Sequence, residues 1–255
     1  VEILEFIMGE HFTHRIINLD TLIQDLRDLG ISSGDTVFIK GNLGAIGLPR
    51  EIDGDIRKVF FEALCKVIGE DGSVMTTAYT SSYLPWNLSK GKVFTDKSPS
   101  TQGGAFANFL LNIPGRERSR HPECSYVAYG KYAKYLTADH DASSLAYTPF
   151  AKLIELNAKM LVFGCHDTNV GMPLGHYMEE YYGLTKRNLL KGLFRVYYFD
   201  QDGCKKLFKR TDLGGCFGSH HFYKYFDESG FWIKGAVGKA LATCINAKDE
   251  FEVWK

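Results

Sequence analysis

Met160-Leu161-Val162-Phe163-Gly164 and, beyond a loop, Gly175-His176-Tyr177-Met178-Glu179-Glu180 carry the first signal of the fold class. The first segment predicts a buried strand, because it is short and apolar and ends in a glycine. The stretch before it, Phe150–Leu156, and the second segment both predict helices. A buried strand between two helices is the repeating unit of α/β proteins.

The same alternation runs through the first two thirds of the chain. Apolar residues at helical spacing predict helices over 19–29, 59–68, 103–112 and 132–136. Short apolar runs predict strands over 36–40, 73–78 and 125–129. Asp20 is the expected N-cap of the first helix, and Gly30 its C-terminal stop.

The remaining segments predict loops, a hairpin and one more helix. Residues 41–47 form a glycine-rich loop, and the polar stretch 81–102 is long enough to cover a cleft. Strands over 194–199 and 205–209 flank an Asp-Gly turn and predict a β-hairpin, whereas 237–245 predicts a helix. We expect one domain, 1–255, with the α/β class: an αβα sandwich with a central mixed sheet and an added antiparallel hairpin.

Composition narrows the classes of function. The 255 residues are 45% hydrophobic and 24% charged, as in soluble globular proteins. Thirty basic and thirty acidic residues cancel, which gives no electrostatic case for binding nucleic acid or an anionic membrane. No apolar run reaches the roughly 20 residues of a membrane span. The acidic start Val1–Glu5 does not predict a signal peptide, so a cytoplasmic location is expected.

The six cysteines are scattered and form no CxxC pair, which predicts free thiols and no structural zinc site. Cys165 follows the apolar run 160–164. It could be a nucleophile beside His166 or His176, but a buried and inert thiol is the more common outcome for such a position.

His176 and Glu179 are three residues apart, so a helix would place them on one face. An imidazole beside a carboxylate is a common general base, because the carboxylate stabilises the charged ring. The pair alone favours the simpler interpretation, a solvated surface pair.

Two other clusters have equally open interpretations. The loop 41–47 would let a ligand approach the backbone, but it matches neither the dinucleotide fingerprint nor the P-loop, and a plain turn explains it as well. Arg116, Arg118 and Arg120 could bind phosphates, or form a solvated charge cluster. His121, beside them, could face a ligand or be a satisfied loop histidine.

Several pieces together resemble the aminoglycoside 3-N-acetyltransferases, a coenzyme-A-dependent family distinct from the GNAT acetyltransferases. The matching pieces follow in order along nearly the whole chain: Gly34-Asp35-Thr36-Val37, Leu43-Gly44-Ala45-Ile46-Gly47, Gly72-Ser73-Val74-Met75, Arg118-Ser119-Arg120-His121-Pro122, Thr148-Pro149-Phe150, Leu161-Val162-Phe163-Gly164 and His176-Tyr177-Met178-Glu179.

The resemblance implies an acyl-CoA donor, expected to be acetyl-CoA, and an amine acceptor, without a metal. It makes His176 the general base, oriented by Glu179. The donor site would be formed by Gly41, Asn42, Leu43, Thr76, Thr77, Arg118 and Ser119. Aromatic rings can stack on a sugar, and carboxylates attract cationic amines, so the candidate acceptor contacts are Tyr83, Trp86, His121 and Glu180.

Departures from the family pattern leave alternatives open. Lys40-Gly41-Asn42-Leu43 lacks two hydroxyl side chains, Thr76 replaces a proline, and Met172-Pro173 replaces polar residues before the histidine. The acceptor is an aminoglycoside or another amino sugar, from a surface polysaccharide or a metabolite, and the donor could be another acyl-CoA. A hydrolase using Cys165 or a His-bound metal, a non-catalytic binding protein, and a homo-oligomer also remain open.

Overall fold

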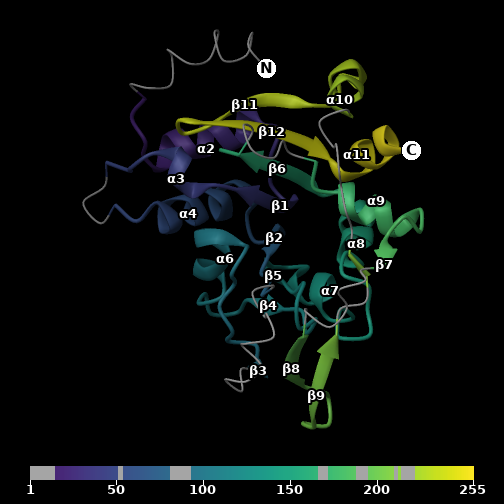
Figure 1. The fold of residues 1–255 in the computed structure, drawn as a ribbon. Coiled ribbons are helices and arrows are strands. Elements are labelled where there is room, and N and C mark those ends of the chain that lie inside the picture. Colours follow the sequence, from purple (N-terminus) through teal and green to yellow (C-terminus); the bar gives the residue numbers. More distant parts are fainter. Residues whose placement is uncertain are drawn as a thin grey trace.

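The computed structural model describes residues 15–50, 54–80, 93–165, 172–187, 195–209, 212–213 and 222–255. Its main sheet has seven strands in the order β11-β12-β6-β1-β2-β5-β4 (Figure 1). These strands are β1 (Thr36–Gly41), β2 (Ser73–Thr77), β4 (Glu117–Arg118), β5 (Tyr126–Gly130), β6 (Lys159–Phe163), β11 (Ile233–Val237) and β12 (Ala240–Asn246).

The sheet is mixed, as predicted. Its three central strands, β6, β1 and β2, run parallel, and antiparallel pairs extend it on either side through β12 and β5. The central strands are the apolar runs of the sequence: Val37, Phe38, Ile39 and Leu161 are at most 1% exposed. Parallel strands need such runs, because both faces of their sheet are covered.

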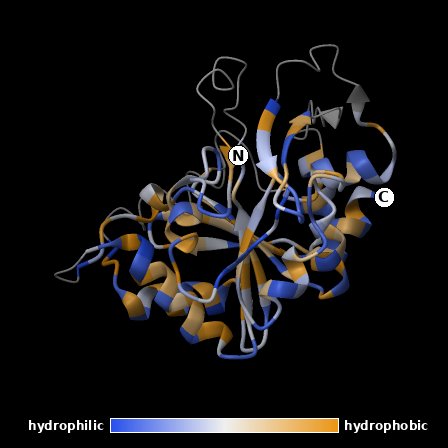
Figure 2. Ribbon diagram, turned by 90° about the horizontal axis from the view of Figure 1, so that it is seen from below, coloured by the Kyte–Doolittle hydropathy of each residue, from blue (hydrophilic) through white to orange (hydrophobic). Residues whose placement is uncertain are grey.

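Helices cover both faces of the sheet, which confirms the predicted sandwich (Figures 1 and 2). One face packs on α2 (Leu19–Asp28), α3 (Leu43–Ile46), α4 (Ile56–Ile68) and α6 (Gly104–Leu110). The other packs on α7 (Ala133–Thr137), α8 (Pro149–Glu155), α9 (Gly175–Tyr181), α10 (Tyr223–Ser229) and α11 (Ala247–Trp254). Successive β1 residues alternate between the two cores, with Val37 and Ile39 in one and Phe38 in the other.

The first helix begins at Leu19, as predicted, but its N-cap lies two residues before the predicted one. Asn18, and not Asp20, is its N-cap: its side chain accepts a hydrogen bond from the Thr21 N–H at 2.8 Å, and Thr21 Oγ1 accepts one from the Asn18 N–H. This reciprocal capping box satisfies two backbone donors, which the Asp20 side chain, inside the first turn, does not replace. Gly30 follows the helix with φ of 78°.

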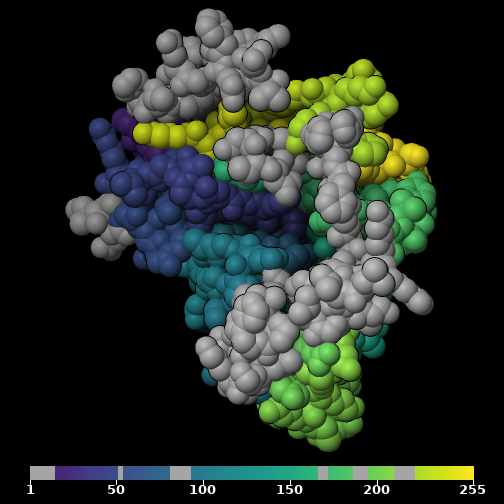
Figure 3. All heavy atoms as spheres, in the orientation of Figure 1, coloured from purple at the N-terminus to yellow at the C-terminus, as the bar shows by residue number. Residues whose placement is uncertain are grey.

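A smaller sheet stands apart from the main one. β8 (Arg195–Phe199) and β9 (Lys205–Lys209) form the predicted antiparallel hairpin, and β3 (Val93–Phe94) adds to β8 in parallel. The hairpin protrudes from the lower end of the molecule in Figure 3. A short antiparallel pair joins β7 (Lys186–Arg187) and β10 (Asp212–Leu213). No helix among the described residues is long and apolar enough to cross a membrane.

Two sequence expectations about elements are wrong. Residues 237–245, expected to be helical, contain the last residue of β11 and most of β12, which pairs with β6 through Ala242 opposite Phe163. Their alanines and leucine suit a helix, but this long-range pairing outweighs the local preference. The loop 41–47 contains a one-turn helix, α3, capped by Asn42.

Candidate active site

The carboxyl ends of the three parallel strands meet at one edge of the main sheet. β1 ends at Gly41, β2 at Thr77 and β6 at Phe163. Ligands of open α/β sheets bind at this edge, because the loops that leave it diverge to opposite faces. The segment that follows β6 leads to α9, so the His176–Glu179 pair belongs to the same edge.

Gly41 is required by the packing of its neighbour strand. A Cβ at this position would lie 2.5 Å from the Phe163 ring. That ring is fully buried and packs edge-on against Phe60 at 5.1 Å. A side chain at position 41 therefore collides with the core, which explains why no hydroxyl residue stands here.

Asn42 turns the chain away from the sheet. Its N–H donates to the Phe163 carbonyl at 3.0 Å, and its side-chain oxygen accepts from the Gly44 N–H, also at 3.0 Å. Leu43, next to it, is 4% exposed and lies in the core. Three of the residues predicted to contact acyl-CoA lie here. Gly41 and Asn42 are exposed at the edge of the sheet, whereas the Leu43 side chain is buried beneath the loop.

His176 and Glu179 form the pair that their spacing predicted. His176 Nδ1 lies 2.8 Å from Glu179 Oε2, and the two side chains are 43% and 18% exposed. A carboxylate only accepts hydrogen bonds, so in a neutral ring Nδ1 carries the proton and Nε2 has the free lone pair. A neutral imidazole held in this tautomer can accept a proton from a bound acceptor.

Tyr147 completes the support of the imidazole. Its ring stacks on that of His176 with centroids 5.1 Å apart and an interplanar angle of 20°. The Tyr147 N–H donates to both carboxylate oxygens of Glu180, at 3.3 and 3.1 Å. Glu179 thus orients the His176 ring, and Glu180 holds the residue that the ring stacks on.

Sequence reasoning did not identify Tyr147. Tyr147 lies on a loop, and no repeat in the sequence relates it to His176, 29 residues later. Its one signal is its place beside Thr148-Pro149-Phe150, a piece of the family resemblance that starts α8.

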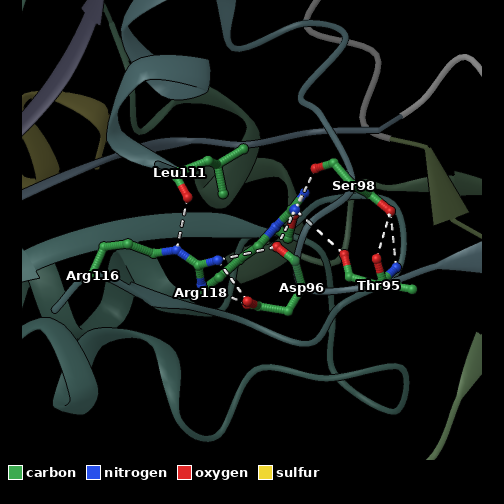
Figure 4. Close-up of polar contacts among 7 residues, drawn as sticks. Thr95, Asp96, Ser98, Leu111, Arg116 and Arg118 are labelled. Atoms are coloured by element: carbon green, nitrogen blue, oxygen red, sulfur yellow. Dashed lines mark hydrogen bonds and ion pairs between the residues drawn. The ribbon is translucent and has the colours of Figure 1, made fainter. Parts of the chain in front are cut away.

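Arg118 lies in the protein interior, 6% exposed (Figure 4). Its guanidinium donates to the carbonyls of Asp96 at 3.0 Å, Ser98 at 2.5 Å and Ala78 at 3.0 Å, and to Ser125 Oγ at 3.1 Å. These contacts bind the segment around Ser98 to the ends of β2 and β5.

Arg116 holds the same segment from the surface. It forms a paired contact with Asp96, with nitrogen–oxygen distances of 2.6 and 2.5 Å, and donates to the Leu111 carbonyl (Figure 4). The hydrogen bond from Arg116 lowers the pKa of Asp96 below its usual value. Both arginines thus organise the chain between β3 and α6.

The other predicted contacts of this region are buried, except for Thr77. Thr76 donates its hydroxyl to the Ile39 carbonyl at 2.8 Å, while Thr77 is half-buried at the end of β2. Ser119 Oγ accepts from the Tyr126 N–H at 2.9 Å. His121 is 2% exposed, and its Nδ1 accepts from the Cys124 N–H at 2.8 Å.

His121 also stacks on a second buried histidine. The ring centroids of His121 and His140 are 4.8 Å apart. His140 contacts Ser119 Oγ at 3.0 Å and the Leu145 carbonyl at 3.1 Å. Burial lowers the pKa of His140 to about 4, so this histidine is neutral near pH 7.

Some predicted positions lie outside the described residues. These are Tyr83 and Trp86, together with His166 beside Cys165. Within the described part of the chain, no group of three or more His, Cys, Asp or Glu residues is placed to hold a metal ion.

Comparison with known proteins relates this chain to a family. The family model described as aminoglycoside 3-N-acetyltransferase matches residues 50–255. The chain belongs to this family. The aminoglycoside N(3)-acetyltransferase VII of Streptomyces paromomycinus is 30% identical in an alignment of 169 residues that covers 56% of this chain and 54% of that protein. The chain thus spans little more than half the length of the first curated family members it matches.

Solved structures share the family fold along nearly the whole chain. AAC-VIa bound to sisomicin has a TM-score of 0.76 and 21% identity, and covers 94% of this chain and 96% of its own. AAC-IIIb in a binary complex with CoASH has a TM-score of 0.71 and 22% identity, with 94% and 95% covered.

Proposed function

We propose that this protein is an N-acetyltransferase that transfers the acetyl group of acetyl-CoA to an amino group of an aminoglycoside or a related amino sugar. The observation that carries the proposal is the half-exposed His176 with Glu179 2.8 Å from its Nδ1. The family membership and the similar fold of structures solved with CoASH and with sisomicin support it.

The chemistry needs one base and no covalent enzyme intermediate. A neutral amine attacks the thioester carbonyl carbon while His176 Nε2 takes a proton from the amine nitrogen. The tetrahedral intermediate collapses, the carbon–sulfur bond breaks, and the imidazolium returns the proton to the leaving thiolate. Glu179 and the Tyr147 ring face stabilise the charged imidazole that forms between these steps.

The donor would lie along the carboxyl edge of the sheet. Gly41, Asn42 and Thr77 are the predicted donor residues accessible there, and glycine lets a pantetheine arm approach the backbone closely. We assign Leu43, Thr76, Arg118 and Ser119 an indirect part, since their polar groups or side chains are engaged inside the protein.

The acceptor site is the less specified half of the proposal. Glu180 and His121 were candidates for acceptor contacts. In our proposal neither contacts the acceptor directly. Glu180 positions Tyr147 through a hydrogen bond, and His121 positions His140 through ring stacking. Tyr83 and Trp86 keep their proposed role of stacking on a sugar ring.

A thiol-release assay tests the proposal. Acetyl-CoA and other acyl-CoAs are each combined with sisomicin, further aminoglycosides and amino-sugar nucleotides. We expect amine-dependent release of free thiol, fastest with acetyl-CoA. Release without any amine would indicate a hydrolase instead, and binding of CoA without release would indicate a non-catalytic protein.

The His176→Ala variant tests the base. We expect kcat to fall by about 10²–10⁴-fold, the usual contribution of a general base. Glu179→Gln should lower kcat less, because the amide oxygen still accepts from Nδ1. Unchanged turnover in His176→Ala would remove the base assignment, even if acetyl transfer itself were demonstrated.

A further inference from the structure

The carboxyl group of Glu250 lies at the start of the helix that carries His176. Glu250 belongs to α11, its side chain is 0% exposed, and its Oε1 accepts a hydrogen bond from the Leu174 N–H at 2.9 Å. Leu174 is the N-cap residue of α9, and its own side chain forms no capping hydrogen bond. A residue 76 positions later in the chain therefore holds the point where α9 begins.

Two groups near the Glu250 carboxyl can donate to it, one on β1 and one on its own helix. Lys40, at the end of β1, interacts electrostatically with the carboxyl group, and the Trp254 indole lies beside it on α11. Burial raises the pKa of the carboxyl group and the indole lowers it, although Glu250 Oε2 and Trp254 Nε1 do not meet in ordinary hydrogen-bond geometry. A carboxyl group buried with one oxygen outside good hydrogen-bond geometry stabilises a fold less than an apolar residue of the same size. Stability alone thus gives no reason for an acid here.

We propose that Glu250 is a positioning residue for His176. The inference rests on the proposed role of His176 as the base. Glu179 and Tyr147 set the orientation of the imidazole ring. Neither fixes where α9 itself starts, and His176 is the second residue of that helix. The Glu250–Leu174 bond fixes this start, and with it the distance between the imidazole and the ends of β1 and β6. A displacement of about 1 Å in such a group is enough to lower a rate about 10²-fold.

Three variants separate positioning from packing. Glu250→Gln keeps a side-chain oxygen that accepts from the Leu174 N–H, whereas Glu250→Leu removes it at similar volume. Glu252→Leu is the matched control, because Glu252 is a glutamate on the same helix with a 61% exposed side chain. We expect Glu250→Leu to lower kcat at least tenfold with an unchanged KM for acetyl-CoA. Glu250→Gln should stay within about threefold of wild type, and Glu252→Leu should equal it.

A second readout does not depend on activity. Nitrogen-15 NMR of the histidine side chains reports the tautomer and the titration midpoint of His176 in the free protein. We expect both to change in Glu250→Leu and to remain in Glu250→Gln. If wild type acetylates no amine, the proposed function fails, but this measurement still tests whether Glu250 controls His176.

Two results would overturn the inference: a folded Glu250→Leu protein with unaltered kcat and His176 titration, or a Glu250→Gln protein as impaired as Glu250→Leu. If Glu250→Leu does not fold, Leu174→Pro removes the same bond from the donor side. The Leu174 φ of −73° suits proline. The expected result is again a lower kcat at unchanged KM, and wild-type kcat in that variant would equally refute the inference.

Discussion

At the scale of single residues, the candidate base is defined by what holds it. His176 is half-exposed, as a group that meets a substrate must be, while its partners Glu179 and Tyr147 are largely buried. In the proposed function this arrangement would let the imidazole meet an amine without moving, and preorganisation of this kind accounts for much of the efficiency of an active site.

The Tyr147 ring should matter for turnover. Tyr147→Leu removes the stack on His176, and we expect kcat to fall by about tenfold, because a loosened base leaves its productive position. Tyr147→Phe keeps the ring and should retain most of kcat. Steady-state kinetics with a confirmed amine measures both, with the exposed Tyr135→Leu as control. Equal rates for the Leu and Phe variants would show that the stack is irrelevant.

Gly41 should be replaceable only at the expense of the core. We expect Gly41→Ser to destabilise the fold by about 1–3 kcal/mol, the usual range for overpacking, because its Cβ meets the Phe163 ring. Urea unfolding measures the change. In a Phe163→Leu background the added penalty should shrink, and a penalty of the same size in both backgrounds would contradict this explanation.

At the scale of elements, the arginine cluster shows how a sequence motif changes meaning in the fold. Arg118-Ser119-Arg120-His121-Pro122 reads as a phosphate-binding stretch, yet Arg118, Ser119 and His121 are at most 6% exposed. Arg118 joins the chain between β3 and α6 to the ends of β2 and β5, and Ser119 accepts from the first residue of β5. The buried residues of the motif thus stabilise this edge of the sheet from inside the protein.

Arg118→Met tests this structural part. Several buried carbonyls lose their donor, and each unsatisfied group costs about 1–3 kcal/mol, so we expect a fall in thermal and urea stability of at least that size. The KM for acetyl-CoA should change little in the protein that remains folded. Arg120→Met is the control, because Arg120 is exposed. A raised KM at unchanged stability would instead favour direct contact with the donor.

At the scale of the whole molecule, two buried groups give stability opposite dependences on pH. Burial lowers the pKa of His140 to about 4, so the unfolded chain binds its proton more readily, and stability rises between about pH 4 and 6.5. Burial raises the pKa of Glu250 to about 8 from an ordinary 4.5, so the folded state keeps its proton longer, and stability falls across that interval. Below pH 6.5 the effects of His140 and Glu250 on stability oppose each other. Above pH 6.5 the destabilisation by Glu250 dominates.

Glu250→Gln should remove that loss. Relative to wild type, the variant should gain stability as the pH rises from about 5 to 8, by at most about 1.4 kcal/mol per pH unit. Urea unfolding at pH 5, 6.5 and 8 measures the difference, with Glu252→Gln as control. A stability difference that is constant over this range would show that Glu250 is ionised in the folded protein throughout.

The strands and helices that sequence predicted well are those with short-range signals. β1, β2 and β6 are apolar runs, and α2, α4 and α8 repeat apolar residues at helical spacing. The failures involve distant partners. β12 is a strand because it pairs with β6, about 80 residues earlier. The local sequence predicts a helix there because it carries no information about a partner strand so far along the chain.

The sequence by itself determined the αβα sandwich and the facing of His176 and Glu179, because hydrophobic periodicity and three-residue helical spacing are local properties. Only the tertiary structure decided what surrounds that pair. Tyr147 reaches His176 from a loop, and Glu250 reaches Leu174 from the last helix. The tertiary structure also decided the role of Arg118. Its guanidinium is buried because β2, β5 and the segment around Ser98 pack around it and supply its acceptors. Such contacts exist only once the chain has folded, since their partners lie far apart in the sequence.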